Sequence, residues 1–119
     1  MRGVLKYTAV AGVLLAFPAW TNAADIEKGK ARFATLCATC HGASGAGDGP
    51  VAAAMPADQK PADLAKGEMK FAVDQVKFAE LLKKGGAAVG LSPMMPPQAG
   101  LSEADVGDLY AFVQSLHGK

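Results

Sequence analysis

Cysteine and histidine are both scarce in this chain, with two of each in 119 residues. Both cysteines and one histidine fall in a single run, Cys37-Ala38-Thr39-Cys40-His41. A zinc site would need a second pair of ligands, and only His117 remains besides the acidic residues. A disulfide-exchange site usually lies in a βαβ context, and no alternating strand pattern surrounds this run. The lack of a second ligand pair disfavours a zinc site, and the lack of a strand pattern disfavours disulfide exchange.

The chain also has no excess of charge of one sign and no long apolar run. Its 12 basic and 11 acidic residues nearly balance. Without the first 23 residues, which hold Arg2 and Lys6, 10 basic and 11 acidic residues remain, a net charge of −1. That balance does not favour a nucleic-acid partner. The apolar stretch 9–19 is about half of the ~20 residues that a membrane-spanning helix needs.

The Cys37–His41 run itself has the C-x-x-C-H spacing at which two thiols and an imidazole hold one c-type haem. Two cysteines three positions apart on a helical turn face the same side, so both can add to the vinyl groups of one porphyrin. His41 is then placed under the iron, for which neutral imidazole is a good ligand. The run predicts one haem c, covalently attached through Cys37 and Cys40.

The N-terminus has the pattern of a secretory signal peptide. Arg2 and Lys6 precede the apolar stretch, and Thr21-Asn22-Ala23 offers small or polar residues before a cut. We expect a signal peptide over 1–23, with cleavage after Ala23 or else after Ala24, and one domain over 24–119. An uncleaved anchor is the less favoured alternative, and no cysteine near the boundary suggests a lipid anchor.

The periodicity of apolar residues predicts an all-α domain with three main helices. The first runs over about 25–40 with Asp25 as its cap, and Ile26, Gly29, Phe33 and Leu36 recur along it. The second runs over about 74–84 with Val76, Ala79 and Leu82 on one stripe. The third starts at a capping-box pattern, Ser102 to Asp105, and buries Val106, Leu109, Tyr110, Val113 and Leu116. A short helical turn is expected over 51–55, and no strand pattern or internal repeat stands out.

Over nearly all of 24–119 the chain resembles the class I c-type cytochromes, in particular the small bacterial monohaem ones. The resemblance rests on the C-x-x-C-H run near the start of the domain, on two proline-containing segments, and on residues of the two terminal helices: 47–50, 95–97, Gly29, Phe33, Leu109 and Phe112. It implies a cytochrome c-like fold in which Gly- and Pro-rich loops wrap one haem.

The iron of an electron-transfer haem needs a sixth ligand, and the methionines are candidates for it. Thioether sulfur is soft and favours ferrous iron. Met95 lies in a loop stiffened by prolines, and in the family the ligand methionine often directly precedes a proline, which selects Met95 and leaves Met94 second. Met55 and Met69 are interpreted as packing residues. His117 is interpreted as a solvated side chain.

A further role follows from the resemblance for Pro50, whose carbonyl is expected to accept a hydrogen bond from the ring N–H of His41. A simple turn-forming proline is the alternative. Eight lysines are candidates for a ring around an exposed haem edge, although a solvated surface explains most of them: Lys28, Lys30, Lys60, Lys66, Lys70, Lys77, Lys83 and Lys84.

The resulting hypothesis is a periplasmic one-electron carrier, not an enzyme, that cycles haem iron between Fe(II) and Fe(III). Its partners would be donor and acceptor cytochromes, dehydrogenases or oxidases of a respiratory chain, and it would be a monomer without a membrane span after signal removal. Two alternatives stay open. In the first alternative, the chain is a permanent cytochrome subunit of a periplasmic dehydrogenase or oxidase complex. In the second, it is a haem enzyme or gas sensor with an open sixth site.

Overall fold

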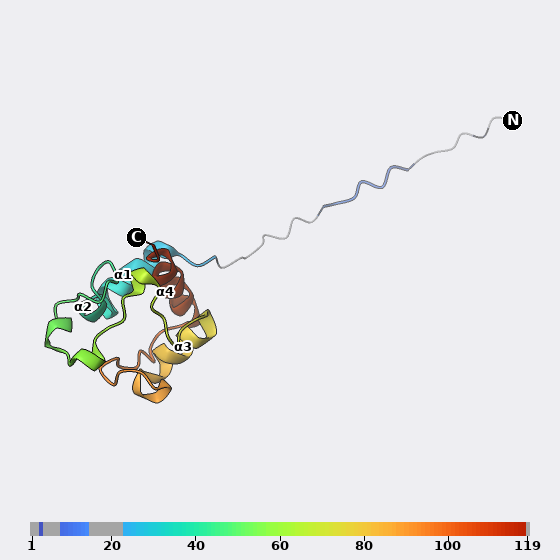
Figure 1. Cartoon of the computed structure of the whole chain (residues 1–119). Helices are drawn as coiled ribbons and strands as arrows, with labels where there is room; N and C mark the ends of the chain where they lie inside the picture. The colour runs from blue at the N-terminus through green and yellow to red at the C-terminus, as the bar shows by residue number, and fades with distance from the viewer. Residues whose placement is uncertain (1–2, 4–7, 15–22, 119) are drawn as a thin grey trace.

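The computed structural model describes residues 3, 8–14 and 23–118, and within them the only regular secondary structure is helical. Figure 1 shows the helices gathered in one body around which the loops run. The α-helices are α1 (Ile26–Leu36), α2 (Ala38–His41), α3 (Gln75–Lys84) and α4 (Glu103–Ser115). Short 3₁₀ turns lie at Ala52–Ala54, Ala57–Gln59, Leu64–Lys66 and Ala87–Val89. The all-α prediction is confirmed, and so is the helical turn expected over 51–55.

The expected signal peptide, 1–23, lies largely outside the described residues. Of that segment the structure describes 3, 8–14 and 23, which form no helix. Within the described ranges, no helix is long and apolar enough to cross a membrane. The cleavage site after Ala23 therefore stays a prediction.

α1 begins as the sequence predicts but ends earlier. The Asp25 side chain caps it by accepting hydrogen bonds from the backbone N–H groups of Glu27 and Lys28, at 3.0 and 3.1 Å. The expected helix over 25–40 is interrupted at Cys37, where φ is −121° and ψ is −35°. The hydroxyl of Thr35 donates to the carbonyl of Ala31 at 3.1 Å, a back-bond that often bends helices. The interruption at Cys37 gives the C-x-x-C-H run its own short helix, α2.

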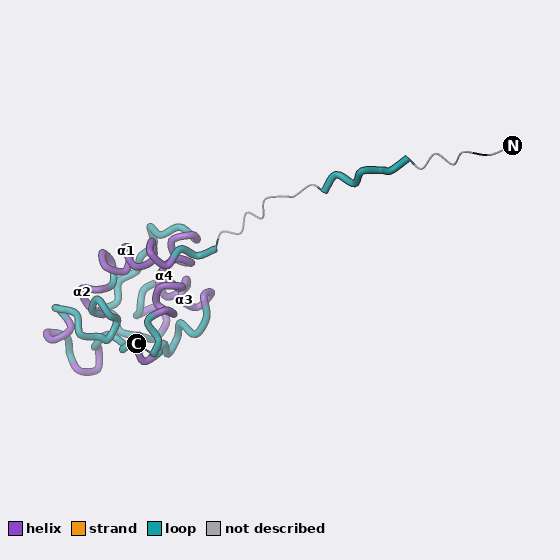
Figure 2. Tube along the Cα trace, turned by 90° about the horizontal axis from the view of Figure 1, so that it is seen from above, coloured by secondary structure: helices purple, strands orange, loops and turns teal. Residues whose placement is uncertain are grey.

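α1 and α4 pack against each other at a point where α1 has no side chain (Figures 1 and 2). A Cβ atom added to Gly29 would overlap the backbone carbonyl oxygen of Asp108 and lie 2.9 Å from Cβ of Phe112. Beside this contact the rings of Phe33 and Phe112 pack with centroids 5.1 Å apart. Phe33 and Leu109 are almost fully buried here. A glycine at this position is what allows the two backbones to approach so closely.

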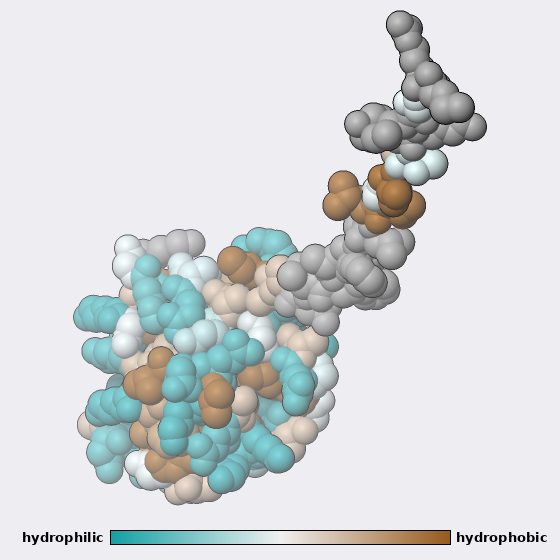
Figure 3. Space-filling view, turned by 90° about the vertical axis from the view of Figure 1, so that its right-hand side faces the viewer, coloured by the Kyte–Doolittle hydropathy of each residue, from teal (hydrophilic) through white to brown (hydrophobic). Residues whose placement is uncertain are grey.

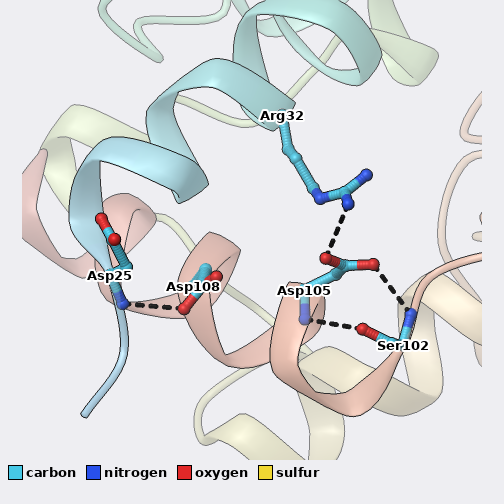
Figure 4. A network of polar contacts seen from close by, with 5 residues as sticks. All are labelled: Asp25, Arg32, Ser102, Asp105 and Asp108. Carbon is cyan, nitrogen blue, oxygen red and sulfur yellow. Dashed lines mark hydrogen bonds and ion pairs between the residues drawn. The ribbon is translucent and has the colours of Figure 1, made fainter. Parts of the chain in front are cut away.

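Polar groups join the same two helices at the surface (Figure 4). Asp108 accepts a hydrogen bond from the backbone N–H of Asp25 at 2.7 Å, and Arg32 pairs with Asp105 at 2.7 Å. Asp105 also accepts from the backbone N–H of Ser102, whose hydroxyl accepts in return from the N–H of Asp105. The predicted capping box is confirmed, and its acidic member also bridges to α1.

α3 and α4 complete the core with Phe78, Leu81, Leu82, Leu109, Phe112, Val113 and Leu116. Asp74 caps α3 by accepting from the N–H of Lys77 at 2.8 Å, as predicted. The predicted stripe on α3 is wrong at Val76, which is 76% exposed. Phe78 takes the inward position, because its ring packs against Tyr110 of α4 in a tilted arrangement with centroids 5.5 Å apart. Val106 and Tyr110, expected to be buried on α4, are only half-buried.

Replacing Gly29 with alanine should destabilise the haem-loaded protein by about 1–3 kcal/mol, because the added methyl group overpacks the contact between α1 and α4. The measurement is guanidinium unfolding followed by far-UV circular dichroism. Gly107→Ala is the matched control, since a Cβ there meets only the Gln75 side chain at 3.4 Å and alanine is the better helix former. Equal midpoints for Gly29→Ala and wild type would contradict the packing argument.

The capping box makes stability depend on pH in a defined direction. The backbone N–H of Ser102, followed by its hydroxyl and by Arg32, lowers the pKa of Asp105 below its ordinary 3.8. A lowered carboxylate pKa stabilises the fold above the ordinary value, and this contribution is lost as the pH falls through the lowered pKa. Asp105→Asn should therefore have a lower free energy of unfolding than wild type at pH 7. The difference between the two free energies should narrow as unfolding is measured toward pH 3. A gap of constant size would mean that the charge of Asp105 plays no part.

Candidate functional site

The two cysteines and His41 lie together on the wall of a large cavity. Cys37 sits at the junction of α1 and α2, and Cys40 and His41 belong to α2. The carbonyl of Cys37 accepts from the backbone N–H of His41 at 2.8 Å, which closes the turn. All three side chains are half-buried. The interruption of the helix at Cys37 therefore still leaves both thiols and the imidazole on the wall of one cavity.

The cavity has a volume of about 650 Å³, within the roughly 300–1,000 Å³ of ordinary cofactor sites. Its walls come from every helix and from the loops between them. Apolar side chains dominate, among them Phe33, Phe78, Leu81, Leu82, Leu109 and Val113. Such walls suit a flat, largely apolar ring rather than a small polar substrate.

The environment of Cys37 does not favour thiol–disulfide chemistry. Burial, and next the nearby Cys40, raise the pKa of the Cys37 thiol from 9.0 to about 11. Exchange sites instead lower the thiol pKa so that the reactive thiolate is present at neutral pH. In the part of the chain that the structure describes, no three His, Cys, Asp or Glu side chains are grouped to hold a metal ion. Neither alternative use of the thiols gains support here.

The His41 ring is oriented by a backbone carbonyl. Its Nδ1 lies 3.2 Å from the carbonyl oxygen of Ala62. A carbonyl can only accept, so Nδ1 carries the hydrogen, and the neutral ring then has its lone pair on Nε2. Burial lowers the pKa of His41, although the hydrogen bond to Ala62 opposes this. The ring is thereby kept neutral, which is the form that binds a metal.

The acceptor predicted for His41 was Pro50, and that prediction is wrong. Pro50 is exposed and lies on a turn that bonds to the backbone of α2, because the N–H of Gly49 donates to the carbonyl of Cys40 at 3.0 Å. The imidazole points elsewhere, toward the segment 61–64. Gly47 holds that segment close: its N–H donates to the His41 carbonyl at 2.7 Å, and a Cβ on it would lie 2.8 Å from the Pro61 carbonyl.

The local sequence around His41 gives no indication that the Ala62 carbonyl is its acceptor. Pro61 to Leu64 is a further proline-containing segment, and it lies about 20 residues after His41. Only the fold of the intervening loop brings it to the imidazole. Pro50 keeps the simpler role of a turn-forming residue.

All four methionines of the described residues line the same cavity. Met95 is half-buried and packs against the core, whereas Met94 is 47% exposed. The sulfur of Met69 accepts a weak hydrogen bond from the Gln114 side chain at 3.9 Å. Met55 is half-buried at the cavity wall. The structure brings Met95 to the same space as His41, and Figure 1 shows α2 and the orange segment of residues 90–98 on different sides of the ring that the chain forms.

The remaining candidates lie away from the cavity or only at its wall. His117 is exposed and does not line it. Of the eight lysines considered for a ring around an exposed haem edge, Lys60 and Lys70 line the cavity. Three of the others pair with acidic neighbours: Lys66 with Asp63, and Lys77 and Lys84 with Glu80. The three ion pairs fit the interpretation of most lysines as a solvated surface, and a ring around a haem edge stays a prediction.

An all-α chain in which two thiols and a neutral imidazole line one large apolar cavity defines a c-type haem protein. The thiols, the imidazole and the size of the cavity all fit that group. A family model described as Cytochrome c matches residues 26–117, and the chain belongs to the cytochrome c family. Haem c is attached through Cys37 and Cys40, and the protein transfers electrons.

Two known proteins are similar to this chain. Cytochrome c-554(547) of Halothiobacillus neapolitanus is 33% identical over 97 residues, which cover 79% of this chain and 99% of that protein. A chain of the reducing HAO-like protein complex of Kuenenia stuttgartiensis is 31% identical, with a TM-score of 0.63 over 77% of this chain. This chain spans 43% of that second protein. The expected cytochrome c-like fold is confirmed.

Replacing Cys37 or Cys40 with serine should leave one thioether at most and reduce the yield of haem-loaded protein several-fold, because each thiol supplies one covalent link. The measurement is haem staining after denaturing electrophoresis, compared with total protein. Thr39→Ser, within the same run but without a thiol, is the matched control. A Cys37→Ser, Cys40→Ser double variant that kept haem through denaturation would refute attachment at these residues.

Proposed function

We propose that this protein is a periplasmic one-electron carrier whose iron is bound by His41 on one side and Met95 on the other. The observation that carries the proposal is that both side chains line the cavity that holds the attachment cysteines. Haem c supplies the Fe(II)/Fe(III) couple. The chain supplies an oriented imidazole with a lone pair on Nε2 and a thioether from a stiff loop, which favours the ferrous state.

The protein is proposed to make and break no substrate bond. Peroxide or oxygen chemistry at haem uses polar groups in the distal pocket. Among the described residues that line the cavity, His41 is the sole imidazole and no arginine is present. With His41 and Met95 both bound, the iron would have no position for a substrate. An electron needs only a short, brief contact between partners, so small docking surfaces suffice.

Export and partners belong to the same proposal. The signal-like pattern of 1–23 would direct the chain to the periplasm, where its partners would be other redox proteins of a respiratory chain. The near balance of charge gives no reason to expect a nucleic acid. The face seen in Figure 3 mixes apolar and hydrophilic residues instead of presenting one broad apolar area, which favours brief contacts and a monomer.

A second function has one observation in its favour. The similarity to a chain of the reducing HAO-like protein complex suggests a permanent subunit as the alternative to a free carrier. Gel filtration of the protein purified from its native source distinguishes the two, because a subunit would elute with its partners.

The test of the ligand pair is an absorption spectrum of the haem-loaded protein in both oxidation states, repeated with carbon monoxide over the ferrous form. We expect a near-infrared sulfur-to-iron band and no carbon monoxide binding. Met95→Ala should lose the band, lower the reduction potential and bind carbon monoxide, whereas Met94→Ala should keep the wild-type spectrum. Rapid carbon monoxide binding by the wild type would instead favour an enzyme or a gas sensor with an open sixth site.

A further inference from the structure

The loop that carries Met95 rests on the two glycines that follow α3. The backbone N–H of Gly86 donates to the carbonyl of Met95 at 2.9 Å, and the carbonyl of Gly86 accepts from the N–H of Leu91 at 2.8 Å. Within the loop, the N–H of Met95 donates to the carbonyl of Ser92 at 3.2 Å. Both ends of the Gly86 peptide are therefore tied to the segment that presents Met95.

Gly86 is buried and has no space for a side chain. A Cβ on it would overlap the carbonyl oxygen of Ser92 and lie 3.2 Å from Cβ of Met95. Its φ and ψ, −62° and −45°, are ordinary right-handed values that any residue adopts. Gly85 differs, because its φ of +81° by itself favours glycine. The requirement for glycine at 86 is thus one of close contact with the Met95 loop, and not of backbone conformation.

The loop is the side that would have to move if Gly86 gained a methyl group. Leu81 and Leu82 fix the end of α3 in the core, with 6% and 2% of their surface exposed. Ser92 and Met95 lie in a loop that is only partly buried. A displacement of that loop moves the Met95 side chain along with its backbone, because the overlapped Ser92 carbonyl accepts from the Met95 N–H and the added methyl group would also lie 3.2 Å from Met95 Cβ.

We propose that Gly86 is a positioning residue for the axial ligand: by lacking a side chain, it sets how far Met95 enters the cavity and so keeps the sixth position of the iron filled. The inference rests on the proposed function, since it takes Met95 as the ligand. It assigns the strength of that ligation to a residue nine positions earlier, outside the proline-rich loop itself.

The experiment compares Gly86→Ala with Gly100→Ala in the haem-loaded protein. Gly100 is the matched control, because a Cβ there meets nothing within 4 Å and its φ is ordinary. Gly86→Ala should weaken the sulfur-to-iron band, lower the reduction potential and raise the affinity of the ferrous form for carbon monoxide by about tenfold or more. Gly100→Ala should match the wild type in all three.

A second variant covers the case in which Gly86→Ala does not mature. The Ser92 hydroxyl accepts from the N–H of Met94 at 3.1 Å and donates to the carbonyl of Gln59 at 3.3 Å, so Ser92→Ala loosens the same loop without adding atoms. Ser92→Ala should weaken the sulfur-to-iron band and raise the carbon monoxide affinity, in both cases by less than Gly86→Ala does. A Met95→Ala, Gly86→Ala double variant should bind carbon monoxide no better than Met95→Ala alone, which a general loss of stability would not produce.

The outcomes separate this inference from the proposed function. A wild-type protein without the sulfur-to-iron band overturns both. A wild-type protein with the band, together with matured Gly86→Ala and Ser92→Ala variants of unchanged spectrum and potential, overturns the role of Gly86 alone. Loss of the band in Gly86→Ala but not in Gly100→Ala supports it.

Discussion

The approach of α1 to α4 at Gly29 is the contact on which the rest of this structure depends. It places the end of α1, and so the Cys37 junction and α2, at one wall of the cavity. The other side of α4 holds α3 through the rings of Phe78 and Tyr110. The end of α3 in turn carries the glycines that support the Met95 loop. Both sides of the cavity are thus positioned from one close crossing of two backbones.

The two proposed axial ligands are held in the same physical way, by backbone groups of glycines pressed against the segment that each ligand uses. On the His41 side, Gly47 keeps the segment of Ala62 within hydrogen-bond distance of the imidazole. On the Met95 side, Gly86 bonds to the carbonyl of the methionine itself. Backbone contacts of this kind leave little freedom to relax, which suits an iron site that should change little in geometry between oxidation states.

Features that depend on a few neighbouring residues were predicted from the sequence. The caps at Asp25, Asp74 and Ser102 are observed, since a side chain that bonds two or three residues ahead needs no tertiary partner. Predictions that needed a partner elsewhere were less successful. Val76 has the right spacing for a buried stripe, but it is exposed because the inward face of α3 is set by Tyr110 and the cavity.

The sequence alone determined the attachment chemistry and the helical class, because the spacing of Cys37, Cys40 and His41 and the period of the apolar residues are properties of short segments. Only the tertiary structure decided that the His41 ring bonds to Ala62 and not to Pro50, and that Gly86 supports Met95. The loops between these residues have no repeating pattern. Where such a loop passes is decided by packing against distant parts of the chain, which local spacing does not encode.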